Sequence, residues 1–275
     1  MTTVPEYRNS YSILRNKVIT IFEKLKKNQF LFEELVKRDF KEKYKRTALG
    51  IAWSVLSPLL TLLIMRLVFT NFFGRNTPFY TTYLFSGNLV MNYFREGTRG
   101  GMTGLMSNAN IISKINIPKY LFVFSRNVAA LVNFLIILVV YFFFCLIDGI
   151  TFGLHMATLV YPIVCVLLFN LGFGMILSAM YVFFRDTQYL YDVFLTLLTY
   201  VSAIFYKIDG FSPVVQRLFL LNPVYCYILY FRTVVIDGII PSLLLHILCG
   251  GYAAVMLGLG FWMYKKYNHK FLYYL

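Results

Sequence analysis

Charged residues are scarce in this chain of 275 residues. Asp, Glu, Lys and Arg together make up 14% of it, against about 25% in a typical soluble domain. Hydrophobic residues reach 59%, and the mean hydropathy is +0.66. This composition excludes an ordinary soluble domain. It predicts an all-α integral membrane protein, because helices satisfy their own backbone hydrogen bonds in lipid.

The common catalytic and phosphate-binding motifs are also missing. The sequence has no GxxxxGK[ST] phosphate loop, no HExxH and no GxSxG. The three histidines lie far apart and the four cysteines form no CxxC pair, so we expect no metal site. No pair of acids falls at membrane depth, which disfavours a proton-coupled carrier. We therefore expect neither an enzyme nor a chain that binds a cofactor itself.

Basic charge is the feature that is abundant. The formal net charge is +14, and 12 of the 26 Lys and Arg residues precede Leu49. Nucleic-acid binding is one interpretation of such a charge. Its concentration beside apolar segments indicates membrane topology and contact with anionic lipid instead.

Residues 29–48 are predicted to form an amphipathic helix at the membrane interface. Phe32, Val36, Phe40, Tyr44 and Ala48 fall four residues apart and so share one helix face, while Lys, Arg and Glu occupy the neighbouring faces. A basic helix with one apolar face lies in a membrane interface or docks on a partner. A solvated helix is the alternative, but an apolar run follows directly and disfavours it.

Six membrane spans are predicted between residues 49 and 264. Residues 1–48 form the N-terminal segment and residues 265–275 a basic tail. The predicted spans are residues 50–72, 79–94, 120–147, 157–184, 189–206 and 243–264. Gly172, Gly174 and Ser178 give the fourth span small residues that let helices approach closely.

Residues 207–242 are semi-apolar and broken by Gly and Pro, and no piece is long enough to span. We therefore predict short re-entrant helices here, tolerated where protein or water satisfies the backbone. Pro213 and the pair Asn222 and Pro223 mark this region, and the pair is predicted to cap and begin a short helix.

Basic residues set the predicted orientation. With the N-terminus inside, the inner segments hold 12, 4, 1 and 3 Lys or Arg, and the outer segments hold 1, 0 and 3. The positive-inside rule then favours six spans with both termini cytoplasmic.

Several motifs resemble one family across about residues 30–265. They are VKRDFKEKYKRTALGIAWSVLSPLL at 36–60, LFSGNLVMNYFREG at 84–97, NANIISKINIPK at 108–119, FFRDTQYL at 183–190, VSAIFYKIDG at 201–210 and LNPVYCYILYFR at 221–232. These segments are similar to those of permease subunits from polysaccharide-exporting ABC transporters of type 2, which carry O-antigen, capsular polysaccharide or teichoic acid. Two positions depart from the expected pattern: Ala203 replaces a common proline, and Arg66 places a charge in a span that is usually apolar.

The resemblance implies a homodimer in the bacterial cytoplasmic membrane that works with two copies of a separate ATPase subunit, which would bind ATP and Mg. It implies an undecaprenyl-linked glycan as substrate. The residues expected at the ATPase contact are Asn108, Asn110, Ile111, Ile112, Lys114, Arg185 and Asp186. Arg185 and Asp186 could equally have a purely structural role at the end of a helix.

The resemblance also makes residues 30–48 a helix at the inner gate, with Arg38, Phe40, Lys41, Tyr44, Lys45 and Arg46 as its site residues. Four of these are cations, which would draw a diphosphate-lipid head towards the gate or simply contact lipid headgroups.

Aromatic residues make up 19% of the chain, more than interface belts explain. A channel for sugars should offer aromatic platforms without tight sites. The candidates for its lining are Arg66, Phe69, Phe72, Tyr83, Phe85, Tyr93, Phe94, Tyr200, Phe205 and Tyr206.

Two other functions remain open at this point. A type-2 permease for a small hydrophobic compound or drug would have the same spans and interface helix. A membrane-embedded glycosyl or acyl transferase is disfavoured because its catalytic motifs are missing.

Overall fold

A computed structural model describes residues 28–45, 47–69, 79–115 and 117–274, and every element in these ranges is a helix. The longer helices are α2 (Gln29–Tyr44), α3 (Trp53–Phe69), α4 (Tyr80–Thr103), α6 (Tyr120–Ile147), α7 (Val160–Phe183), α8 (Thr187–Val201), α10 (Pro223–Val235) and α11 (Leu243–Tyr267). The shorter elements are η1 (Gly50–Ala52), η3 (Met106–Asn108), α5 (Ala109–Ile112), η4 (Leu154–Leu159), α9 (Pro213–Phe219) and α12 (Phe271–Tyr274).

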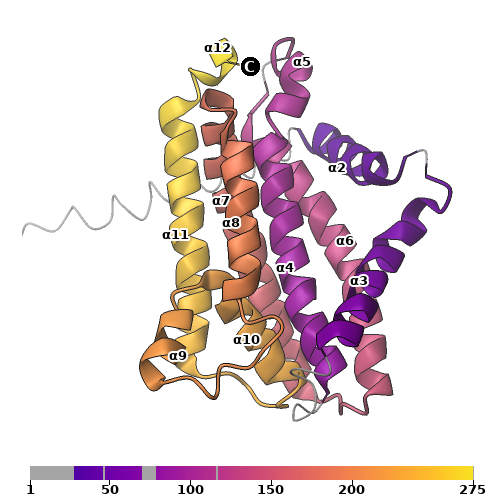
Figure 1. Cartoon of the computed structure of the whole chain (residues 1–275). Coiled ribbons are helices and arrows are strands. Elements are labelled where there is room, and N and C mark those ends of the chain that lie inside the picture. Colours follow the sequence, from indigo (N-terminus) through magenta and orange to yellow (C-terminus); the bar gives the residue numbers. More distant parts are fainter. Residues whose placement is uncertain (1–27, 46, 70–78, 116, 275) are drawn as a thin grey trace, which may run out of the picture.

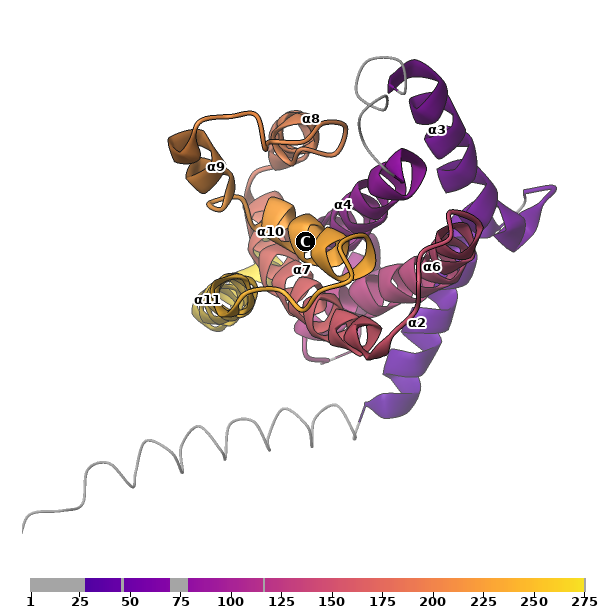
Figure 2. The same cartoon turned by 90° about the horizontal axis from the view of Figure 1, so that it is seen from below.

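The long helices form a bundle with α7 at its centre (Figures 1 and 2). α7 packs along α11 and α4, and α4 also packs along α6. α3 leans away from the bundle on one side, and α2 lies crosswise over one end (Figure 1). α5 and α12 lie at this same end, whereas α9 and α10 lie at the opposite one (Figure 1).

Glycines bring the helix backbones together, as the small residues of the fourth span predict. A Cβ atom on Gly172 of α7 would lie 2.3 Å from the carbonyl carbon of Met256 in α11, and one on Gly260 would lie 2.5 Å from the Gly172 oxygen. Gly174 meets Gly101 of α4 in the same way, at 3.4 Å. No larger residue fits at Gly172 unless the backbones separate.

Four helical segments in the described residues are long and apolar enough to cross a membrane: Gly50–Phe69, Tyr120–Ile147, Leu154–Phe183 and Leu243–Tyr267. α9 and α10 would add a fifth if the bent pair counts as one span. The predicted third span coincides with α6, and the predicted sixth span begins where α11 begins. Over the described residues, these findings establish an all-helical fold with four or five candidate spans.

Several helix boundaries differ from the sequence predictions; α8, for example, ends at Val201, although the fifth span was predicted to reach residue 206. α4 continues to Thr103, although the second span was predicted to end at residue 94 and residues 95–119 to form a polar connection. The glycines of this stretch lie against other helices instead of forming a loop, as the contact between Gly101 and Gly174 shows. α2 ends at Tyr44 instead of Ala48, because Lys45 is extended and Gly50 adopts a φ of +51°.

The region of residues 207–242 contains two short helices that meet at 102°. Pro213 begins α9, and Pro223 begins α10. The Asn222 side chain accepts hydrogen bonds from the backbone N–H groups of Val224, at 3.0 Å, and Tyr225, at 3.3 Å. The predicted cap at Asn222 is therefore confirmed.

The departure at Ala203 has a physical reason in the turn after α8. Ala203 has a φ of +50°, in the left-handed region. Proline fixes φ near −65° and cannot adopt this conformation. The chain therefore makes a turn here that the proline expected from the resemblance would forbid.

Substituting Gly172 should destabilise the bundle. We expect Gly172→Ala to lower the free energy of unfolding by about 1–3 kcal/mol, because its Cβ atom would overlap the α11 backbone. Thermal unfolding of the purified protein in detergent measures this. Gly258→Ala on α11 is the matched control, since its Cβ atom would meet nothing within 4 Å. Equal midpoints for the two variants would contradict the close approach.

Candidate functional site

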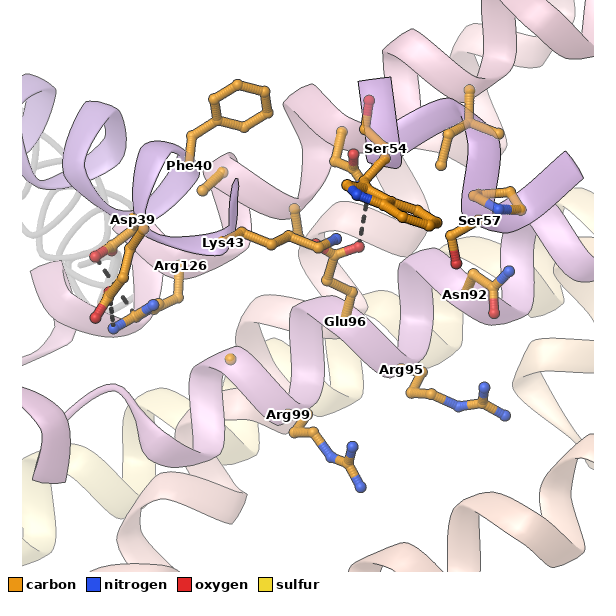
Figure 3. Close-up of a pocket in the computed structure, with 18 of the residues that line it drawn as sticks. Asp39, Phe40, Lys43, Ser54, Ser57, Asn92, Arg95, Glu96, Arg99 and Arg126 are labelled. Atoms are coloured by element: carbon orange, nitrogen blue, oxygen red, sulfur yellow. Dashed lines mark hydrogen bonds and ion pairs between the residues drawn. The ribbon is translucent and has the colours of Figure 1, made fainter. Parts of the chain in front are cut away.

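A cavity of about 950 Å³ lies beneath α2, between α3, α4 and α6 (Figure 3). Its charged lining comprises Asp39, Glu42, Lys43, Arg95, Glu96, Arg99 and Arg126. Its polar and aromatic lining includes Phe40, Thr47, Trp53, Ser54, Ser57, Thr61, Asn92, Thr103 and Asn133. Such a lining offers charges, hydroxyls, amides and aromatic rings to a single occupant.

Asp39 anchors α2 to α6 at one edge of the cavity. The residue is 4% exposed, and its carboxylate accepts a hydrogen bond from the Ser125 hydroxyl at 2.8 Å. It also accepts from the Arg38 guanidinium at 2.7 Å, and Arg126 Nε lies 3.6 Å away. A buried carboxylate is stable only with such partners, so Asp39 fixes α2 against α6.

A second set of contacts joins α2 to the inner wall of the cavity. Arg126 donates to Glu42 at 3.1 Å, which adds to its contact with Asp39 (Figure 3). Lys43 forms an ion pair with Glu96 of α4, and Asn133 of α6 donates to Glu96 at 2.9 Å. Glu96 thus links three helices around one carboxylate.

The two remaining arginines of the lining bind α8. Arg95 donates to the Thr199 hydroxyl at 3.1 Å, and Arg99 forms an ion pair with Asp192. In Figure 3 both side chains point away from α2. The Arg95 and Arg99 side chains therefore extend from one side of α4 towards α8, and the Glu96 side chain extends from the other side towards α2.

The buried face of α2 differs from the predicted apolar stripe. Leu35 and Asp39 are its buried residues, each 4% exposed, whereas Phe32, Val36 and Phe40 are half-buried. The face against α6 is therefore rotated from the stripe, because the Asp39 contacts hold it there.

The other predicted gate residues lie along α2 and just after it. Lys41 and Lys45 are exposed, and Arg38 is half-buried beside Asp39. Tyr44 is the last residue of α2. Arg46 lies outside the described residues. The gate role of this helix stays a prediction.

The predicted ATPase-contact residues gather at the end of the bundle where α2 lies. Asn110, Lys114, Arg185 and Asp186 are exposed, and Ile111 is half-buried. Asn108 and Ile112 are buried, so they hold α5 in place and are less open to a partner. A short helix, α5, lies among these residues, between the predicted second and third spans.

The C-terminal tail is tied to the start of α6 beside α5. Lys119 donates to the Asn268 carbonyl oxygen, and its ammonium lies 5.8 Å from the centre of the fully buried Phe271 ring. Burial lowers the pKa of Lys119. The Phe271 ring also packs 5.9 Å from the Phe183 ring, so α12 lies against the end of α7.

The predicted channel residues divide into two groups. Phe85, Tyr93 and Phe94 are buried within the chain; Phe85 packs edge-on against Tyr141, and Phe94 packs against Phe169. These three rings lie in the core of this one chain.

The second group gathers at the end of the bundle opposite α2. The Phe69 ring stacks on Phe205 with centroids 4.7 Å apart, and Tyr83 donates to the Tyr206 carbonyl at 2.7 Å. Tyr200 of α8 is 62% exposed. Arg66 is also exposed, and Phe72 lies outside the described residues. The channel role of all these residues stays a prediction.

The sequence analysis missed the residues that hold the cavity together. Asp39, Glu96 and Arg126 were not predicted to act at the site. A signal was present for Arg126, because it falls inside a predicted span, where an ionisable residue calls for a partner.

Comparison with known proteins decides the family. The sequence profile of the ABC-2 type transporter family matches residues 31–236. The chain belongs to the ABC-2 type transporter family. The matched range begins in α2 and ends after α10, so all residues that line the cavity fall within the ABC-2 domain.

Three curated relatives carry the same printed name. The O-antigen export system permease protein RfbA of Klebsiella pneumoniae is 27% identical over 245 residues, which cover 87% of this chain and 94% of that protein. A second protein of that name from the same organism is 26% identical over 245 residues. The RfbA protein of Myxococcus xanthus is 26% identical over 231 residues, 82% of this chain and 87% of its own. This ABC-2 chain is therefore similar to these permeases over almost its whole length.

Glu96→Ala should loosen α2. The substitution removes the acceptor for Lys43 and Asn133, so we expect α2 to open at least about fivefold more often, as a loss of about 1 kcal/mol implies. Trypsin digestion of the purified protein, followed at Lys41 and Lys43, measures this opening. Glu33→Ala is the control, because Glu33 is exposed and contacts Gln29 within α2. Equal cleavage rates would show that Glu96 does not hold the helix.

Proposed function

We propose that the chain is the membrane-spanning permease subunit of an ATP-driven exporter that moves a lipid-linked polysaccharide across the bacterial cytoplasmic membrane. The observation that carries this proposal is the similarity to O-antigen export permeases over 87% of the chain, with 94% of the relative covered. The same family also includes the open alternative, a permease for a hydrophobic compound. The lining of the cavity favours the glycan.

The cavity beneath α2 has the chemistry that a sugar substrate needs. Ser57, Thr61, Asn92 and Asn133 provide hydroxyl and amide groups that exchange hydrogen bonds with sugar hydroxyls. Trp53 provides an aromatic face, which suits the apolar face of a sugar ring. A site for a hydrophobic compound usually has only a few polar groups, fewer than the charged, hydroxyl and amide side chains that line this cavity.

Cations near the cavity suit the charged end of such a substrate. Lys41 of α2 and Lys45 just after it are exposed, and Arg38 of α2 lies beside Asp39. A diphosphate joins the glycan to its undecaprenyl lipid and carries negative charge. Its attraction to these cations would bring the head of the substrate to the gate.

The topology proposed for this function has six spans, α3, α4, α6, α7, α8 and α11, with both termini in the cytoplasm. α4 is long enough to cross but less apolar, since its polar residues line the cavity. α8 has 15 residues and is about 22 Å long at 1.5 Å per residue, which is shorter than the hydrocarbon core of about 30 Å. The turn that follows α8 must therefore complete the crossing. α9 and α10 would then be re-entrant helices at the outer side.

The proposed complex contains two copies of this chain and two copies of a separate ATPase subunit, which binds ATP and Mg. α5 would contact the ATPase as the coupling helix, with Lys114 and Arg185 exposed beside it. α2 would lie in the inner interface as the gate helix. Membrane lipid surrounds the spans, and nucleic acid is not expected to bind.

Deleting the gene in its native bacterium should stop polymer from reaching the cell surface. A polymer-specific antibody on intact cells measures surface polymer, and the same antibody on lysed cells measures polymer that accumulates inside. We expect surface signal to fall and internal signal to rise. Unchanged surface polymer would contradict the proposed function.

Complementation with Lys114→Glu tests the coupling role of α5 in the same assay. The variant should reach the membrane at wild-type level, because Lys114 is exposed, yet restore little surface polymer. Lys270→Glu, an exposed lysine of the C-terminal tail, is the matched control and should complement. Full complementation by Lys114→Glu would exclude a coupling role for this residue.

A further inference from the structure

A second cavity lies at the end of the bundle opposite α2 and α5. It measures about 120 Å³ and is enclosed by α4, α10 and the loop that follows α8. α10 lies at the lower end in Figure 1. For scale, a cavity of about 150 Å³ in another protein binds one benzene molecule. This cavity is smaller and open at its rim, so it would take part of a sugar ring while the rest of the ring lies at the rim.

Arg232 of α10 lines this cavity, and its side chain is buried, with 6% of the residue exposed. Its Nη1 donates to the Ala203 carbonyl at 2.9 Å, and its Nη2 donates to the carbonyls of Tyr83, at 3.2 Å, and Ile204, at 3.0 Å. Its Nε donates to the Ser86 hydroxyl at 3.4 Å. The guanidinium is thus occupied by acceptors of this chain, and an anion would have to displace them.

Because the Arg232 guanidinium is occupied, the groups that could hydrogen-bond to a ligand lie at the rim of the cavity. Asp209, Asp237 and Lys207 line it, and within the described residues their side chains form no hydrogen bond or ion pair with one another or with other groups. Carboxylates accept hydrogen bonds from hydroxyl groups, and an ammonium donates to them. The two acids and the two cations, Lys207 and Arg232, balance in charge. A neutral ligand with many hydroxyls fits this balance better than an ion.

Two tyrosines complete the wall. Tyr83 is 6% exposed and Tyr225 is 4% exposed, so the little surface that each retains is directed into the cavity they line. Phe219 packs edge-on against Tyr225 with centroids 5.3 Å apart, and the Arg232 guanidinium carbon lies 3.4 Å from the centre of the Tyr83 ring. Both rings are held rigidly, and the small exposed part of Tyr225 offers an aromatic contact to the C–H groups of a sugar.

We propose that this cavity binds one neutral sugar residue of the exported polymer at the outer end of the permease. Sugar hydroxyls would donate to Asp209 and Asp237 while the ring lies against Tyr225. The location on the export path depends on the proposed function, whereas binding of a sugar to the cavity does not. The cavity beneath α2 and this one would then contact the polymer at opposite ends of the bundle.

Saturation-transfer difference NMR on the purified full-length chain in lipid nanodiscs tests the proposal. The probes are glucose, galactose, mannose, rhamnose and N-acetylglucosamine, each added alone. We expect transfer to at least one of them, reduced about tenfold in the double variant Asp209→Ala/Asp237→Ala, since two hydrogen bonds are lost. Arg217→Ala, an exposed residue of α9 that does not line the cavity, is the control and should keep the signal.

Several results would overturn the proposal. They are the absence of transfer to every probe, full transfer in the double variant, and stronger transfer to glucuronic acid than to its neutral counterpart glucose. Gel filtration and the thermal midpoint verify that the variants fold, and Asp237→Asn, which keeps one acceptor oxygen, should retain part of the signal. If sugars bind as expected but gene deletion leaves surface polymer unchanged, the export function fails and the sugar site stands.

Discussion

A buried carboxylate on a helix that lies across the bundle needs compensation, and the position of α2 depends on how Asp39 obtains it. Ser125 and Arg126 of α6 provide two of its contacts and Arg38 provides the third. Arg126 also binds Glu42, and Glu96 binds Lys43 of the same helix. If these contacts were absent, α2 would be held mainly by Leu35, which is buried, and by Leu31 and Phe32, which are partly buried. The cavity would then lose its cover.

The bundle beneath α2 is rigid for a different reason. Gly172, Gly260 and Met256 bring α7 and α11 into backbone contact, and Gly101 does the same for α4 and α7. Aromatic rings fill much of the space between the helices, as in the contacts of Phe85 with Tyr141 and Phe144. Packing inside the chain therefore accounts for part of the aromatic surplus. A cavity with charged and polar lining residues lies beneath α2, and a smaller cavity lies beside α10 at the opposite end of this frame.

The sequence predicted the long apolar helices well, because hydropathy over about 20 residues is a local signal. α6 and the start of α11 agree with it, and the Asn222 cap depends on neighbouring residues alone. The contact of Asp39 with Arg126 joins positions far apart in the chain and has no such signal. Residues 95–103 were misread because glycines and arginines favour a loop locally, whereas here Gly101 serves close packing and Arg95 and Arg99 bind α8.

The central claim is that Asp39 and Arg126 stabilise the seat of α2 on α6 as a pair. A double-mutant cycle with Asp39→Ala, Arg126→Ala and the double variant tests it, with the free energy of opening of α2 measured by native-state proteolysis. Removing Arg126 alone leaves the buried Asp39 charge undercompensated, so the account predicts that the double variant costs at least about 1 kcal/mol less than the sum of the single variants. Additivity within about 0.3–0.5 kcal/mol would contradict it.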